Sequence, residues 1–155
     1  MIEIERKFLV KSDAFKQEAS KSYPIKQGFL NSDAHRTVRV RLKKDTGYLT
    51  IKGKSTENGV SRFEWEKEIS ITEAEALLLL CEKGTIHKTR YEVVAGKHTF
   101  EIDVFFNSNE GLIVAEVELN SEDEHFEKPE WLGEEVTGDV RYYNSQLSNR
   151  PYKTW

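Results

Sequence analysis

Apolar and polar side chains alternate with a period of two over much of this chain. Such alternation is typical of β-strands that bury one face and present a polar face on the other side. We predict eight strands, in the segments 2–10, 23–31, 36–44, 47–54, 59–70, 85–95, 97–106 and 111–120. Short runs of turn-forming residues separate most of these segments, which favours antiparallel neighbours.

Helical signals are fewer. A short helix is expected to begin at 12–15. A longer one is expected at 72–82, where Thr72 is the expected N-cap and Glu75 completes a capping box. Another helix is expected to begin at 121–124, and a final one to occupy 139–148. The pattern therefore predicts a mainly β protein of the α+β class. A sheet of this many strands tends to curl and close.

Charged side chains on the polar faces are grouped by sign. Acidic residues share a face in the first and last strands, whereas Arg or Lys pairs occupy the strands near 39 and 89. For any one strand, a solvated outer face is the ordinary interpretation. If the charged faces instead line the inside of a closed sheet, the apolar outer face needs cover. The helices at 72–82 and 139–149, with Trp131 and Trp155, are expected to supply part of it.

A lumen that carries both signs of charge is costly unless its charges pair closely or bind a ligand. A polyphosphate with divalent cations would satisfy both signs. Arg and Lys side chains bind phosphate oxygens, and carboxylates supply the hard oxygen ligands that Mg²⁺ and Mn²⁺ prefer. The pattern therefore indicates a site for a highly charged, metal-associated anion.

The composition excludes several kinds of partner and site but does not identify a function. The chain has 155 residues and a formal net charge of −4, so nothing global suggests nucleic acid or an anionic membrane as a partner. Its single cysteine, Cys81, excludes an intramolecular disulfide and a multi-cysteine zinc site. The charged start of the chain does not resemble a signal peptide, and no run reaches transmembrane length. We expect one soluble, cytoplasmic domain over residues 1–155.

The charged motifs, taken in order, resemble the CYTH superfamily, also called triphosphate tunnel metalloenzymes. The defining Glu-x-Glu-x-Lys motif corresponds to Glu3-Ile4-Glu5-Arg6-Lys7. The resemblance continues through Arg39-Val40-Arg41, Lys52, Glu64, Lys88-Thr89-Arg90, Asp103, Glu116-Val117-Glu118 and the segment 131–137. It implies a closed, eight-stranded antiparallel barrel with a charged tunnel and a few helices packed outside. The length is similar to that of the short bacterial branch of inorganic triphosphatases.

The resemblance also implies roles for individual residues. The enzyme would use Mg²⁺ or Mn²⁺ to release the terminal phosphate of inorganic triphosphate or a related small triphosphate or polyphosphate. One metal would bind Glu3, Glu5, Glu116 and Glu118, and a second would bind Glu64 and Asp103 together with Glu116. Lys7 would also help to position the attacking water. The residues implied to bind the triphosphate are Lys7, Arg39, Arg41, Lys52, Lys88 and Arg90.

Two positions depart from the family pattern. Phe29 follows Gln27-Gly28, where triphosphatase relatives often carry a tyrosine, so a hydroxyl that could orient Lys7 or the water is absent. Relatives also commonly carry a basic residue two positions before the tyrosine of the tail motif. Here only Arg141 is nearby, and it could either substitute or point away.

Three other functions remain open at this stage. The same site could act as a class IV adenylyl cyclase, or it could bind polyphosphate or nucleotide without catalysis. An ordinary carrier barrel with an apolar lumen and a charged exterior is the third alternative.

Overall fold

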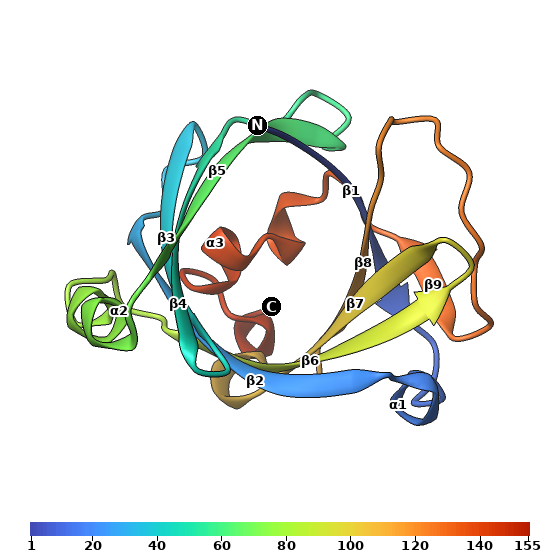
Figure 1. Cartoon of the computed structure of the whole chain (residues 1–155), viewed down its shortest axis with the longest axis horizontal. Helices are drawn as coiled ribbons and strands as arrows, with labels where there is room; N and C mark the ends of the chain where they lie inside the picture. Colours follow the sequence, from blue (N-terminus) through green and yellow to red (C-terminus); the bar gives the residue numbers. More distant parts are fainter.

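Eight antiparallel strands close into a barrel, which confirms the predicted fold class (Figure 1). The computed structural model describes residues 1–155. Around the barrel the strand order is β5-β4-β3-β2-β6-β7-β8-β1, and pairing of β1 with β5 closes the ring. The barrel strands are β1 (Ile2–Val10), β2 (Lys21–Asn31), β3 (Arg36–Lys43), β4 (Thr46–Gly53), β5 (Ser61–Ile69), β6 (Ile86–Ala95), β7 (His98–Phe105) and β8 (Ile113–Glu118).

The first strand closes the barrel because it pairs with different partners along its length. Residues 2–4 pair with β5, and residues 5–9 pair with β8, where Glu5 lies opposite Glu118. The end of β1 also pairs with a ninth strand, β9 (Leu132–Glu135). The sequence pattern does not predict β9, since a four-residue strand that includes Gly133 and two glutamates shows no alternation of apolar and polar residues.

The buried apolar side chains form two clusters, one outside the barrel wall and one inside an end of the barrel. The larger cluster covers the outside of β1, β6, β7 and β8 beneath α1 (Phe15–Glu18) and the segment after β8. Its centre is Trp131, which packs edge to face on Phe15 and Phe100. The smaller cluster fills one end of the barrel interior and consists of Phe29, Ile86, Phe105, Leu112, Val114, Val136, Tyr142 and Leu147.

The helix α2 (Ile71–Leu78) packs outside β2, β3 and β4, close to the predicted segment 72–82. Its capping box consists of Ser70 and Glu73, not Thr72 and Glu75 as the sequence suggested. Both pairs fit the same spacing, so the sequence pattern alone does not separate them. Ala74 sits directly on Gly47, where an added Cβ would lie only 2.7 Å from the alanine methyl. Close packing against the strand thus sets where the helix lies.

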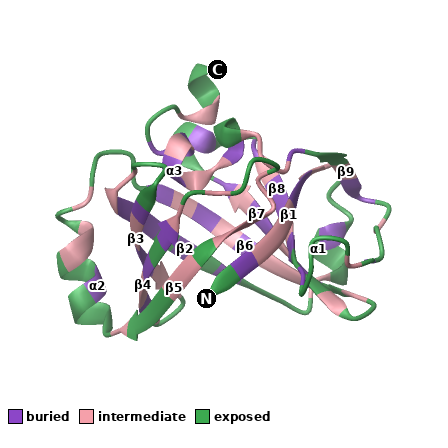
Figure 2. Ribbon diagram, turned by 90° about the horizontal axis from the view of Figure 1, so that it is seen from above, coloured by how far each residue is buried: buried purple, intermediate pink, exposed green.

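The C-terminal tail closes one end of the barrel instead of covering its outer face, which corrects the prediction for residues 139–149. Its helical turns are η2 (Val140–Tyr142), α3 (Asn144–Leu147) and η3 (Tyr152–Thr154). In Figure 1 the tail lies within the ring of strands, and in Figure 2 it sits at one end of the barrel. Tyr142 and Leu147 join the internal apolar cluster, so burial of these side chains draws the tail inward.

The predicted helix at 121–124 is absent, and this segment forms a turn. The Glu124 carboxylate accepts a hydrogen bond from the Asn120 backbone N–H at 2.6 Å and pairs with His98. Local side-chain bonding of this kind favours a turn over a helix. None of the helices in the structure has the length and apolarity needed to cross a membrane.

Candidate active site

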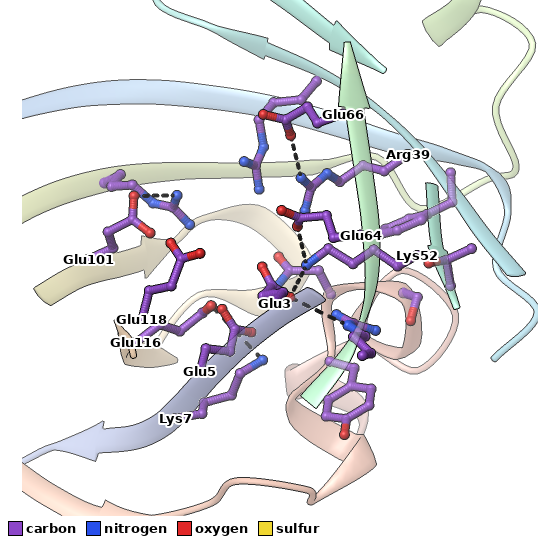
Figure 3. Close-up of a pocket in the computed structure, with 18 of the residues that line it drawn as sticks. Glu3, Glu5, Lys7, Arg39, Lys52, Glu64, Glu66, Glu101, Glu116 and Glu118 are labelled. Atoms are coloured by element: carbon purple, nitrogen blue, oxygen red, sulfur yellow. Dashed lines mark hydrogen bonds and ion pairs between the residues drawn. The ribbon is translucent and has the colours of Figure 1, made fainter. Parts of the chain in front are cut away.

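The charged faces of the strands line a cavity of about 190 Å³ inside the barrel. Its lining is almost entirely polar or charged, which excludes the carrier alternative with an apolar lumen. Figure 3 shows side chains from opposite walls converging on this space. The lining residues are Glu3, Glu5, Lys7, Phe29, Thr37, Arg39, Arg41, Lys43, Lys52, Arg62, Glu64, Glu66, Arg90, Glu101, Glu116, Glu118, Tyr143, Asn144 and Ser145.

Strand alternation and register together bring these side chains inward. Every second residue of β1, starting at Glu3, faces the lumen, and so do the matching residues of β8. Because Glu5 lies opposite Glu118 and Lys7 opposite Glu116, the carboxylates of β1 and β8 stand side by side (Figure 3). The antiparallel pairing therefore creates one acidic wall.

Glu5 and Glu116 affect each other's ionisation on the acidic wall. Burial, followed by the charges of Glu116 and Glu3, raises the pKa of Glu5 well above its usual range. Burial opposes ionisation of Glu116 too, but the charge of Lys7 and a hydrogen bond with Glu5 hold its pKa well below its usual range. Lys7 Nζ lies 3.9 Å from Glu116 Oε1 and donates to the Tyr142 carbonyl at 3.3 Å. The two carboxyl groups thus lie side by side next to a lysine.

Glu3 is bound to cations rather than to its acidic neighbours. Lys52 Nζ lies 2.8 Å from Glu3 Oε1 and 3.2 Å from Glu64 Oε2, and Arg62 Nε lies 3.6 Å from Glu3 Oε1. Burial opposes ionisation of Glu3, but the charge of Lys52 leads the opposing effects and lowers its pKa to about 2. Burial and the contact with Glu3 raise the pKa of Glu64.

Two guanidinium groups stand together on the basic wall. Arg39 Nε is buried without a hydrogen-bond partner and is the only such side-chain atom in the structure. Burial, followed by the charge of Arg39, lowers the pKa of Arg41 to about 9. A buried donor without a partner is costly, and adjacent cations repel each other. Both features indicate a site built for an anion.

Lys88 and Asp103 lie beneath the cavity wall rather than on its surface. Lys88 Nζ lies 2.7 Å from Asp103 Oδ2, and Arg90 binds both oxygens of Asp103, at 2.8 and 2.9 Å. Burial lowers the pKa of Lys88 to about 7. Of the twelve residues predicted for the site, the structure therefore brings ten to the cavity and places these two behind it. Arg90 lines the cavity and binds Asp103, so it connects the cavity surface with the ion pair behind it.

Other cavity residues had no predicted role. Arg62, Glu66 and Glu101 follow the strand alternation, which puts all three on polar strand faces but does not distinguish them from solvated residues. Tyr143 and Asn144 come from the tail, and nothing in the period-two pattern indicated them. Arg141 is exposed and binds Asp139 at 2.7 Å, so it points away from the site. Phe29 lines the cavity and belongs to the internal apolar cluster.

The acidic wall has the donor chemistry for a divalent cation. No three acidic or histidine side chains are already arranged as a metal cluster. However, burial and neighbouring carboxylates raise the pKa values of both Glu5 and Glu118, so the wall carries uncompensated acidic groups. Carboxylate oxygens are the ligands that Mg²⁺ and Mn²⁺ prefer. The residues present therefore fit such a metal.

The fold and the site define a class of proteins: closed antiparallel barrels that bind a highly charged anion in their lumen. The family model described as "CYTH domain" matches residues 1–152, and this chain belongs to the CYTH family. This confirms the family resemblance found in the order of the charged motifs.

Similar proteins carry the name inorganic triphosphatase. One from Acetivibrio thermocellus is 49% identical over 154 residues, which cover 99% of this chain and 97% of that protein. Another from Nitrosomonas europaea is 39% identical, with 96% and 97% covered. The crystal structure of an inorganic triphosphatase superposes with a TM-score of 0.64 at 35% identity, covering 94% of this chain and 96% of that one.

Proposed function

We propose that this protein is a metal-dependent hydrolase that releases the terminal phosphate of inorganic triphosphate or a related small triphosphate. The observation that carries the proposal is the lumen itself, in which the guanidinium groups of Arg39 and Arg41 face the same cavity as an acidic wall. The names of its close relatives support the same reaction.

The basic wall binds the phosphate chain. Arg39, Arg41 and Lys52 present cationic donors to the cavity, and Arg90 and Lys7 add donors from other strands. Guanidinium groups can bind two phosphate oxygens at once, which fixes the orientation of the chain. Lys88, ion-paired to Asp103 behind the wall, contributes positive charge and holds Arg90 in place through their shared carboxylate.

The acidic wall holds the metal. Glu3, Glu5, Glu116 and Glu118 are the proposed ligands of one ion, and Glu64, Asp103 and Glu116 those of a second. A bound divalent cation neutralises phosphate charge and polarises the bond to be broken. Asp103 would have to leave its partners Arg90 and Lys88 to act as a ligand, so it is the weakest member of this set.

Lys7 is the proposed catalytic residue. Its ammonium lies between Glu116 Oε1 and the Tyr142 carbonyl, and 5.2 Å from the centre of the Tyr143 ring. These contacts keep a proton donor at the edge of the acidic wall, where it can orient water toward the terminal phosphorus. Catalysis then depends mainly on positioning and charge stabilisation, as in phosphoryl transfer generally.

The test is phosphate release from inorganic triphosphate, ATP and thiamine triphosphate, each with Mg²⁺, Mn²⁺ or EDTA. We expect release that requires the metal and is fastest with one of these triphosphates, which then identifies the substrate. Triphosphate binding without release would instead indicate a non-catalytic binding module. Formation of cyclic AMP from ATP would indicate the adenylyl cyclase alternative. The proposed cytoplasmic location is tested separately by fractionation of the source cells.

A further inference from the structure

Asn144, at the start of α3, brings an amide group from the C-terminal tail to the wall of the lumen cavity. Its Oδ1 accepts hydrogen bonds from Lys88 Nζ and from Gln27 Nε2, each at 3.0 Å. The amide is therefore held on one side by two donors from the barrel wall.

The neighbouring cations fix which end of this amide faces the wall. A lysine ammonium has only donors, so the atom of Asn144 that contacts Lys88 must be the oxygen. Arg41 Nε donates to Gln27 Oε1 at 2.9 Å, which turns Gln27 Nε2 toward Asn144. Both contacts, with Lys88 and with Gln27, require Asn144 to supply an acceptor. A flipped amide would place its NH₂ group against a donor in each of them.

The Nδ2 group of Asn144 is consequently free for a ligand. It makes no hydrogen bond within the protein. It is not sealed off either, because Arg39 Nε is the only buried side-chain polar atom without a partner. Arg41 and Lys88 already experience repulsion from neighbouring cations. A neutral donor at this place can bind an anion without adding a further positive charge.

We propose that Asn144 Nδ2 donates a hydrogen bond to a phosphate oxygen of the triphosphate bound in the lumen. This inference rests on the triphosphate-binding function proposed above. It makes the tail part of the substrate-binding site, in addition to closing the barrel. Asn144 is then a neutral substrate-binding residue that complements the cationic side chains of the lumen.

The first experiment measures the affinity for inorganic triphosphate by calorimetry in the wild type, Asn144→Asp and Asn149→Asp. Asn144→Asp keeps the acceptor for Lys88 and Gln27 but replaces the free donor with an oxygen. Asn149→Asp makes the same chemical change on the same tail, where Nδ2 contacts Ser32 Oγ and the Ser145 carbonyl. We expect binding about tenfold weaker or worse in Asn144→Asp and within about twofold of wild type in Asn149→Asp.

The second experiment uses only the wild-type protein, so it is independent of the negative charge that Asn144→Asp adds and of whether that variant folds. The side-chain NH₂ signals of Asn144 are followed by ¹⁵N NMR in the wild type during titration with inorganic triphosphate. A large shift of this pair at saturation is expected. Saturable binding that leaves the pair unmoved, or Asn144→Asp binding as tightly as wild type, overturns the inference but leaves the proposed function intact. Absence of triphosphate binding to the wild type overturns both.

Discussion

At the scale of single residues, the lumen is a set of charges that satisfy one another incompletely. Glu3 and Lys52 pair closely, and Asp103 is held by Lys88 and Arg90. Other groups are left in excess, above all the Arg39 donor and the Glu5 carboxyl. Buried charges without complete pairing lower stability, and the barrel keeps them where an anion and a cation would complete the set.

Removal of the Glu5 carboxylate is expected to abolish turnover. In Glu5→Gln we expect phosphate release from triphosphate to fall by at least about a hundredfold, because a metal ligand and its charge are lost. The melting temperature should stay the same or rise, since repulsion from Glu116 is relieved. Glu135→Gln is the matched control, because Glu135 pairs with Arg6 on the outside of the barrel. Full activity in Glu5→Gln would rule out its role.

Asp103 is expected to stabilise the fold in a pH-dependent way. Burial opposes its ionisation, but Arg90 and Lys88 lower its pKa to about 2. A carboxyl whose pKa falls on folding contributes stability that is present above its unfolded pKa of about 4 and is lost as pH falls toward 2. Asp103→Asn should therefore cost about 3–5 kcal/mol at pH 7.

Unfolding in urea across pH 2 to 7 measures this difference. The gap in unfolding free energy between wild type and Asp103→Asn should narrow steadily below about pH 4. A gap that is constant over this range would show that the ion pairs of Asp103 do not account for its contribution.

At the scale of elements, the strands could be predicted far better than the helices. The period of two located all eight barrel strands, since each strand has one face in the lumen and one against apolar cover or solvent. That the charged face points inward came from the family resemblance, because alternation reads the same in either orientation. Short helices depend on tertiary contacts, which local signals such as Ser121–Glu124 do not contain.

Two substitutions at the start of α2 distinguish the observed capping residue, Ser70, from the predicted one, Thr72. The Ser70 side chain accepts from the Glu73 N–H at 3.0 Å, so Ser70→Ala should cost about 1 kcal/mol of unfolding free energy. Thr72→Ala should be neutral or slightly stabilising, because Thr72 lies within the first turn and alanine favours helix. Thermal or urea unfolding of both variants checks this. A larger loss in Thr72→Ala than in Ser70→Ala would contradict the capping assignment.

At the scale of the whole molecule, the barrel divides its interior between packing and binding. The tail closes one end of the barrel (Figure 2). An apolar cluster fills this end, and the remaining lumen is a polar cavity. The tail could not be placed from the sequence because its buried apolar residues, Tyr142 and Leu147, are too few to show a period. Its cavity residues Tyr143 and Asn144 were therefore also missed. The charged residues on the strands could be predicted from the sequence, because the alternation of apolar and polar positions repeats from strand to strand.

The central claim is that the lumen binds triphosphate and metal together. It is tested most directly by a crystal structure of the protein with inorganic triphosphate and Mn²⁺, using the anomalous signal to locate the metal. We expect phosphate density against Arg39 and Arg41, with an anomalous peak bound by carboxylates of β1 and β8. Triphosphate bound outside the barrel, or a lumen that stays empty at saturating ligand, would contradict it.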